Sequence, residues 1–385
     1  MTPANPIFGG MPTTVFEVMS RLAREHDAIN LGQGFPDGAG PRDVLEAAGR
    51  AVVEGWNQYP PMLGLAELRQ AVAAHEHRFY GLEVDWQTET MVTSGATEAL
   101  AACLLGLITP GDEVVLFQPL YDAYVPMVRR AGGVPRFVTL GPPDWRLTRE
   151  ALQAAVSERT RLILFNNPLN PAAKVFDRDE LALIAEAAVA ADAVVICDEV
   201  YEHLVFDGRP HIPLITLPGM RRRCLKIGSA GKTFSLTGWK VGYITAAAEL
   251  LAPVSKAHQF LVFTTPPNLQ AAVAYGLGKD DSYFTGLVAE MQAKRDRFAT
   301  GLKRIGFDVL PCGGTYFVNI DIAGTGFNGD DVAFCRHITE QAGVAAIPVS
   351  AFYHQDALTT VARFCFAKAD TVLDGALERL DRHFG

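Results

Sequence analysis

A lysine in a loop rich in glycine and hydroxyl side chains is the first candidate for chemistry. Lys232 lies in the run Ser-Ala-Gly-Lys-Thr-Phe-Ser-Leu-Thr-Gly-Trp-Lys, with the hydroxyl of Ser229 before it and the cation of Lys240 after it. A cofactor that carries a carbonyl and a phosphate needs an amine for a Schiff base, and hydroxyls and a cation for the phosphate. This run could supply all three, although a lysine in such a loop, taken alone, is usually solvated.

Polar residues that follow apolar, strand-like runs are the next candidates. Asp198 and Tyr201 follow the run 194–197, and Asn170 lies in Asn-Asn-Pro-Leu-Asn-Pro after Phe165. Asp198 could pair with a pyridine nitrogen and keep the ring protonated as an electron sink, while Asn170 and Tyr201 contact the oxygen of the same ring. Acids after strands and Asn-Pro turns are also ordinary loop features.

Two anion sites complete the set. Gly95, Ala96 and Thr97 stand between a strand-like run and a helical pattern, where the open amides of a helix N-terminus favour a phosphate. Arg363 lies among apolar residues and needs an anionic partner if it is buried. That partner is either a structural carboxylate or the α-carboxylate of a substrate held in a bidentate fork.

The elements that must position these residues show two rhythms. Short apolar runs at 91–94, 113–117, 161–165, 194–197, 224–227 and 241–245 are separated by helical patterns such as 97–107 and 179–190. This alternation predicts a mostly parallel sheet with helices on both faces, and ligands then lie beyond the carboxyl ends of the strands.

A different order of elements follows residue 275. It consists of a long helix (284–305), a strand (315–320), a helix (330–342), a strand (361–367) and a final helix. The first forty residues show no helical pattern. We therefore predict an N-terminal arm (1–40) that joins the small domain, a large cofactor-binding domain (41–275) and a small α+β domain (276–385).

Composition excludes several classes of protein. A net charge of -9 over 385 residues argues against sequence-independent nucleic-acid binding, and the absence of an apolar run of membrane-spanning length argues against a membrane protein. The six scattered cysteines and the absence of a signal-peptide pattern predict a cytoplasmic protein. No metal site is expected.

Taken together, and in this order, these segments resemble the class I/II aminotransferases of fold type I, from about residue 6 to residue 381. Residues 30–37, 238–242 and 346–350 resemble the methionine and kynurenine (glutamine/aromatic) branch. The resemblance implies the cofactor pyridoxal 5'-phosphate and an α/β fold. Its large domain would hold a mostly parallel seven-stranded sheet between helices, beside a smaller α+β domain.

The resemblance also implies roles. Lys232 would form the Schiff base and shuttle a proton between the substrate's Cα and the cofactor's C4′, with Tyr121 stacked on the ring. Arg363, the backbone of Gly34 and Asn170 would bind the α-carboxylate. Tyr59 would reach the phosphate of the neighbouring subunit, which implies a homodimer with shared active sites. The phosphate would be bound within one subunit by Gly95, Ala96, Thr97, Ser229 and Lys240.

Three positions depart from the family pattern. Lys240 stands where many relatives have arginine, Gly231 where a second serine is common, and Ala173 where glycine is usual. The first change replaces a fork with a point charge, the second removes a hydroxyl, and the third puts the geometry of a turn in doubt. None removes a catalytic group.

Side-chain preference is predicted from residues 258–263, which contain no arginine. An acidic substrate side chain bound there would be unpaired and desolvated, so we expect a neutral or aromatic L-amino acid (methionine, kynurenine, glutamine or phenylalanine-like) and a 2-oxo acid as substrates of a ping-pong reaction, with Phe263 as a contact. The alternative is a cysteine-S-conjugate β-lyase. A non-catalytic effector domain is a remote alternative, because no basic winged-helix segment precedes the domain.

Overall fold

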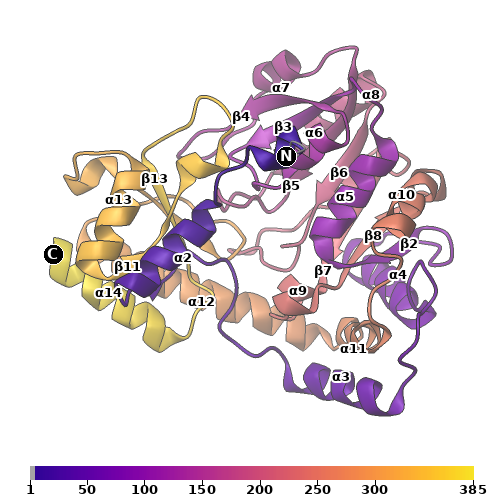
Figure 1. Ribbon diagram of the computed structural model, residues 1–385, viewed down its shortest axis with the longest axis horizontal. Coiled ribbons are helices and arrows are strands. Elements are labelled where there is room, and N and C mark those ends of the chain that lie inside the picture. The colour runs from indigo at the N-terminus through magenta and orange to yellow at the C-terminus, as the bar shows by residue number, and fades with distance from the viewer. Residues whose placement is uncertain (1–4) are drawn as a thin grey trace.

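The computed structural model describes residues 5–385, and its largest element is a seven-stranded sheet (Figure 1). Strand β8 runs antiparallel to both of its neighbours, and the other strands run parallel to one another. The predicted mostly parallel seven-stranded sheet is confirmed. In spatial order its strands are β2 (Thr90–Thr93), β8 (Gly242–Ala246), β7 (Cys224–Ser229), β6 (Val194–Asp198), β5 (Thr160–Asn166), β3 (Glu113–Gln118) and β4 (Val134–Thr139).

Helices cover both faces of this sheet, which is why its central strands are apolar at nearly every position. Leu116 and Leu164 point to one face, while their neighbours Val115 and Ile163 point to the other, and all four are fully buried. The first face packs against α5 (Gly95–Leu107), α6 (Tyr124–Arg130) and α10 (Ala248–Leu261), and the second against α7 (Arg149–Ala155) and α8 (Arg178–Ala190). None of the helices within residues 5–385 combines the length and apolar character that crossing a membrane requires.

A third cluster of apolar side chains lies at the β2–β8 end of the sheet. Val92 of β2 and Tyr243 of β8 pack there against side chains such as Val72 and Val273. The helices that contribute are α3 (Arg42–Glu54), α4 (Ala66–Tyr80) and α11 (Pro267–Leu277).

The C-terminal residues form a separate antiparallel sheet, at the left of Figure 1. A two-residue parallel pairing of β1 (Ile29–Asn30) with β11 (Val344–Ala345) attaches the N-terminal arm beside it. The sheet consists of β12 (Ile347–Pro348), β13 (Val361–Cys365), β10 (Phe317–Asp321) and β9 (Asp308–Val309), with α12 (Asp281–Ile305), α13 (Asp331–His337) and α14 (Asp370–Phe384) around it. Domain boundaries at residues 40 and 275 remain a prediction.

The prediction of a non-helical arm was wrong. Residues 1–4 lie outside the described residues, but α1 (Pro6–Gly9) and α2 (Val15–Glu25) are helical. Thr14 caps α2 by accepting a hydrogen bond from the Glu17 amide at 3.3 Å. Met19 and Ala23 are buried four residues apart, so one apolar face of a short helix went unrecognised between stretches rich in glycine and proline.

A buried ion network fixes β7 relative to its surroundings. The amine of Lys226 donates to Glu76 of α4 at 2.8 Å and to Glu202 at 2.7 Å, and all three side chains are buried. Glu202 belongs to the segment after β6 that also carries Tyr201, and β6 itself ends at Asp198. Because an unpaired charge in the interior is very costly, this network restricts how β7 and that segment can move apart.

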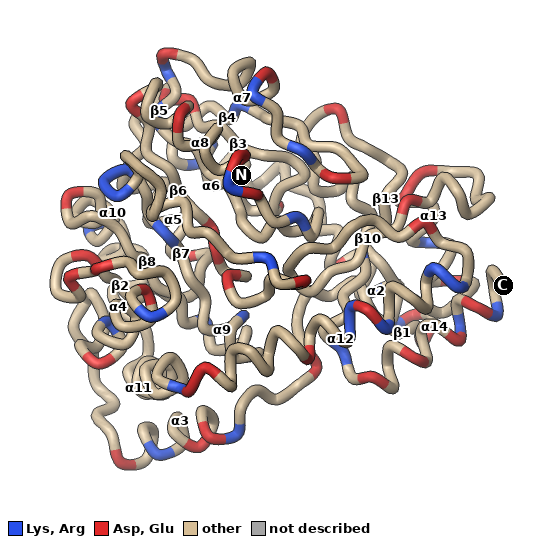
Figure 2. The backbone as a smooth tube through the Cα atoms, turned by 180° about the vertical axis from the view of Figure 1, so that it is seen from behind, with Lys and Arg blue, Asp and Glu red and all other residues tan. Residues whose placement is uncertain are grey.

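Charged residues elsewhere are interspersed along the backbone (Figure 2). The one short basic run, Arg221–Arg223, is paired residue by residue with Glu89, Glu249 and Asp192. This run is therefore a set of individual surface ion pairs.

Candidate active site

One edge of the large sheet gathers the polar candidates. Ser229 of β7 lies beside Gly242 of β8, which lies beside Thr93 of β2. Because β8 runs in the opposite direction, the residues just before it lie at the edge where β2 and β7 end. This topology brings Lys240 to the loops that carry Gly95 and Lys232.

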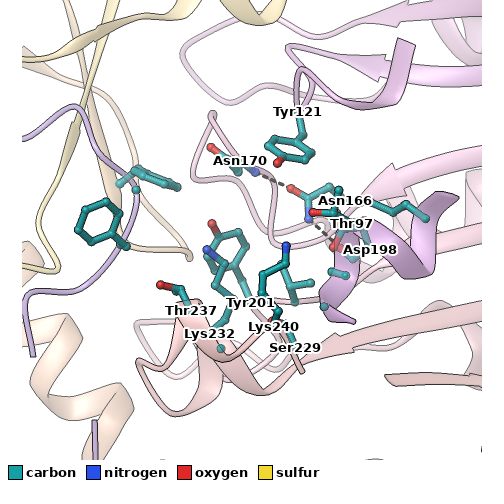
Figure 3. A pocket seen from close by; sticks show the side chains of 18 of the residues that line it. Thr97, Tyr121, Asn166, Asn170, Asp198, Tyr201, Ser229, Lys232, Thr237 and Lys240 are labelled. Atoms are coloured by element: carbon teal, nitrogen blue, oxygen red, sulfur yellow. Dashed lines mark hydrogen bonds between the residues drawn. The ribbon is translucent and has the colours of Figure 1, made fainter. Parts of the chain in front are cut away.

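The loops at this edge enclose a pocket of about 320 Å³, within the size range of small-molecule sites. Figure 3 shows Lys232, Tyr201 and Lys240 on one side of it, Tyr121 and Asn170 on the opposite side, and Asn166 and Asp198 at the right between the two. Twelve of the predicted site residues line it: Gly34, Gly95, Ala96, Thr97, Tyr121, Asn170, Asp198, Tyr201, Ser229, Lys232, Lys240 and Arg363.

The start of α5 forms an anion-binding corner of the pocket. Gly95 has a left-handed backbone (φ +77°), and a Cβ there would lie 3.4 Å from the Lys240 amine. A Cβ on Gly242 would lie 3.0 Å from the amide nitrogen of Ala96. Both glycines therefore let backbone amides and a cation converge, and the N-terminal amides of α5 add their dipole. The corner suits a phosphate.

The three departures from the family pattern fit locally. Lys240 adopts a left-handed backbone (φ +54°) and directs its amine to Gly95. A Cβ on Gly231 would lie 3.0 Å from the Cα of Thr237, which leaves little room for a serine. Ala173 has φ +58°, so it keeps the left-handed geometry that glycine adopts without strain.

Asp198 presents one free oxygen to the pocket. Its Oδ2 accepts a hydrogen bond from the hydroxyl of Tyr124 at 2.5 Å, whereas its buried Oδ1 has no partner among residues 5–385. Burial raises the pKa of this carboxyl to about 6, against the hydrogen bond from Tyr124. A buried acceptor without a donor needs a ligand donor, and a cationic ring nitrogen would bring this pKa down again.

Lys232 lies near the opposite end of the same space. Its amine donates a hydrogen bond to the hydroxyl of Tyr316 at 2.6 Å. Burial lowers the pKa of the amine from 10.5 to about 8, because desolvation penalises the ammonium form. A primary amine with this pKa is partly unprotonated near neutral pH and can attack a carbonyl carbon.

This pKa predicts the pH dependence of cofactor capture. Only the free amine is nucleophilic, so the rate at which cofactor-free protein takes up pyridoxal phosphate should rise with pH and level off above about 8. Stopped-flow absorbance from pH 6 to about 10.5 measures this rate. A rise that continues to the top of that range, as for a solvated lysine, would contradict the burial argument.

Arg363 of β13 is a buried cation that has no carboxylate partner among residues 5–385. Its guanidinium donates to Asn170 Oδ1 at 2.7 Å and to the Gly32 carbonyl at 3.1 Å, and it lies 3.9 Å from the centre of the Phe317 ring. Burial lowers the pKa of Arg363 to about 10, and no carboxylate of the described chain pairs with it. A structural carboxylate partner for Arg363 is therefore absent from residues 5–385, and a ligand carboxylate fits.

A chain of hydrogen bonds connects this arginine to Asp198. The backbone N–H of Asn170 donates to Asn166 Oδ1 at 2.7 Å, and Asn166 Nδ2 donates to the backbone carbonyl of Asp198 at 2.7 Å (Figure 3). The residue that would bind a substrate carboxylate and the residue that would bind a ring nitrogen are thus held in a fixed relation by Asn170 and Asn166.

Two predicted residues lie outside this pocket. Tyr59 and Phe263 contact each other edge-to-face at 5.4 Å and expose 81% and 39% of their surface. Tyr59 was predicted to reach the phosphate of the neighbouring subunit and Phe263 to contact the substrate, and both roles stay predictions.

Several residues that shape the pocket were not predicted. Tyr124 and Asn166 bind Asp198, Tyr316 binds Lys232, and Phe16 and Phe317 line the wall. Tyr124 and Asn166 stand inside segments that were recognised, beside residues that were assigned roles. A hydrogen-bonding side chain next to a catalytic motif was the available signal.

These residues fit pyridoxal phosphate part by part. Gly95, Lys240 and Ser229 suit its phosphate, the free Oδ1 of Asp198 its ring nitrogen, and Lys232 its carbonyl. Two observations support this fit: the buried Oδ1 of Asp198 has no hydrogen-bond partner among residues 5–385, and a Cβ at Gly95 or Gly242 would fill the phosphate corner.

Comparison with known proteins agrees with this geometry. Residues 26–380 match the family model described as aminotransferase class I and II. The chain is 47% identical to a protein of Mycobacterium tuberculosis named N-succinyldiaminopimelate aminotransferase, over 96% of this chain and 95% of the relative. It is 41% identical to the methionine aminotransferase of Escherichia coli, with 96% and 95% covered. A solved structure of the M. tuberculosis enzyme superposes with a TM-score of 0.96 at 46% identity, covering 99% of this chain and 100% of that one.

Proposed function

The chain belongs to the class I and II aminotransferases, and we propose that it transfers the α-amino group of a neutral or aromatic L-amino acid to a 2-oxo acid. Its cofactor is pyridoxal phosphate, which when bound acts as an electron sink for the carbon that loses a proton. The fold is that of fold type I, and the substrates of the family are amino acids and 2-oxo acids.

Each residue of the pocket would have a separate role in the proposed reaction. Lys232 would hold the cofactor through its carbonyl group, and its amine would carry the proton that leaves the substrate's α-carbon. Asp198 holds a proton on the ring nitrogen, and Arg363 with Asn170 orients the α-carboxylate. Tyr121 lines the pocket, where its side chain would cover the cofactor ring and exclude water.

The proposed donor class rests on the charges of the pocket wall. Three cations line it within the described chain, and each has an assigned partner: Lys232 for the carbonyl, Lys240 for the phosphate and Arg363 for the α-carboxylate. The lining also includes the aromatic rings of Phe16 and Phe35. A second substrate carboxylate would be desolvated here without a counter-ion, whereas a thioether or aromatic side chain would not.

A second candidate donor is N-succinyldiaminopimelate. The observation that favours it is the 47% identity to the M. tuberculosis protein of that name. Its succinyl group carries a distal carboxylate, which would need a cation from outside the pocket of one chain. The two donors therefore differ in a property that a direct assay can measure.

We also propose a homodimer with shared sites. Trp56, Tyr59 and Phe260 expose between 73% and 84% of their surface, an unusual cost for large aromatic side chains that stay in water. Burial of these rings against a second copy would place Tyr59 at the boundary, as predicted, together with Phe263, which contacts it.

The test is a spectroscopic titration of the holoenzyme. L-Methionine, L-kynurenine, L-glutamine, L-aspartate and N-succinyl-LL-diaminopimelate are added in turn, and the visible absorbance of the bound cofactor is followed. Loss of absorbance that a 2-oxo acid restores demonstrates amino transfer, and we expect methionine or kynurenine to act at least about tenfold faster than aspartate.

Other outcomes of this titration reject parts of the proposal. Preference for the succinylated donor would overturn the neutral donor class and keep the aminotransferase. Accumulation of pyruvate from a cysteine conjugate, without recovery of the absorbance, would indicate the β-lyase.

A further inference from the structure

The hydroxyl of Tyr316 stands between the amine of Lys232 and the N-terminal segment. It accepts a hydrogen bond from Lys232 Nζ at 2.6 Å and donates its own proton to the carbonyl oxygen of Gly34 at 2.7 Å. A phenol has a single proton, so the bond to Gly34 leaves only the oxygen lone pairs for Lys232. Tyr316 can therefore act toward this amine only as an acceptor.

The tyrosine cannot easily turn away. Its ring is 1% exposed and contacts Tyr201 edge-to-face at 5.1 Å and Phe317 at 4.9 Å. Its backbone carbonyl accepts a hydrogen bond from the amide of Phe366 at 3.0 Å. The hydroxyl is thus held at a fixed position in the pocket region.

The residue before it is strained. Thr315 is fully buried and β-branched, yet it has a left-handed backbone (φ +67°). Its amide donates to the Leu204 carbonyl at 2.8 Å, and its Oγ1 accepts from the Phe317 amide at 3.2 Å. Strain of this kind persists where the surroundings over-determine a conformation, and it is concentrated at functional sites. Here the left-handed backbone of Thr315 sets the direction in which the side chain of Tyr316 points.

Several charged or titratable groups surround the amine of Lys232. Asp198 approaches from the end of β6, Arg363 and Cys365 from β13, and Lys240 from the loop before β8. Among the described residues, Tyr316 is the one whose side chain hydrogen-bonds the amine directly. The hydrogen bond from Lys232 to Tyr316 is thus a direct contact, whereas the other groups act on the amine through longer-range electrostatic interactions.

We propose that Tyr316 is a positioning residue for amino transfer: it holds the amine of Lys232 whenever that amine is not bonded to the cofactor, and anchors it to the backbone of Gly34. Gly34 was predicted to bind the substrate carboxylate, so the lysine and the carboxylate site share one anchor. The inference rests on the proposed function and on Lys232 as its lysine.

The first experiment measures the amine itself. In full-length protein stripped of cofactor, the pH dependence of Lys232 acetylation by acetic anhydride is read by mass spectrometry of its peptide, in wild type and in Tyr316→Phe. Losing an acceptor disfavours the ammonium form, so the pKa of Lys232 should fall by about 0.5 to 1 pH unit. Tyr353→Phe is the matched control, because Tyr353 also donates to a backbone carbonyl, that of Leu140 at 3.0 Å, outside the pocket.

The second experiment uses the holoenzyme. We expect kcat of Tyr316→Phe to fall about 3- to 10-fold, with KM for the amino donor changed less than about twofold, since the amine is oriented less well while the substrate contacts remain. Replacement of Tyr316 by 3-fluorotyrosine keeps the shape and weakens the acceptor, so it should shift the pKa in the same direction by a smaller amount. This variant serves if Tyr316→Phe does not fold.

An unchanged Lys232 pKa in both variants would overturn the inference, as would a kcat equal to that of wild type. Neither result touches the proposed function, which fails only if wild-type protein does not capture pyridoxal phosphate or transfer amino groups.

Discussion

Replacing Lys232 with alanine should lower the rate of amino transfer by about 10⁴-fold, the upper range for removal of a general acid–base group. The loss has two physical causes. The cofactor loses its covalent attachment to the chain, and the proton on the substrate's α-carbon loses the amine that moves it. Borohydride treatment followed by intact-mass measurement should show covalent cofactor in wild type and none in the variant.

The controls separate chemistry from folding. Lys303→Ala removes an exposed lysine of α12 and should leave both the rate and the mass signal unchanged. A small primary amine added to Lys232→Ala should restore part of the rate, because it supplies the missing base without the geometry. A variant that still attaches the cofactor covalently would show that another amine performs the reaction.

Replacing Arg363 with methionine should lower kcat/KM for every amino-acid donor by about 10²- to 10³-fold, as expected when a buried charge partner of a carboxylate is removed. Arg363→Lys should cost about tenfold, since it keeps the charge and loses the fork. Most of the effect should appear in KM, because the α-carboxylate is held in the ground state as well as in the transition state.

A substrate without a carboxylate gives the decisive comparison. A primary amine such as 3-(methylthio)propylamine reacts slowly with wild type, and its rate should be the same in Arg363→Met within about twofold. If the variant loses activity toward this amine as strongly as toward methionine, Arg363 acts through structure and not through the carboxylate. The spectrum of the bound cofactor should stay that of wild type.

Sequence patterns identified pocket-lining residues most directly where a polar residue follows a strand. Asp198, Asn170 and Lys232 were each placed by the rule that ligands lie beyond the carboxyl ends of parallel strands, and the structure brings all three to one pocket. Lys240 obeys the same geometry for the opposite reason, since it precedes the antiparallel strand β8. This rule about strand ends requires only the order of strands and helices along the chain, and the apolar runs in the sequence indicate that order.

Contacts between segments far apart in the sequence could not be predicted from local patterns of residues. Tyr316 lies 84 residues from Lys232 along the chain, and no local pattern announces their hydrogen bond. Strand β4 was also missed, because Pro135 and Arg136 interrupt its apolar character at the edge of the sheet, where one side of the strand is open. Helix α2 was missed because its partners are β11 and β12, more than 300 residues away.

The pairing of β1 with β11 constrains the order in which parts of the enzyme can fold during synthesis. Ile29 leaves the ribosome early, but its partner Val344 is made roughly 300 residues later, which takes on the order of 15 to 60 s during synthesis. By then the residues of β2 to β8 and of the phosphate corner have already been synthesised. A nascent chain can therefore assemble its cofactor cradle first, while the arm with Phe16 and Gly34 waits for the last part of the polypeptide to close the substrate side.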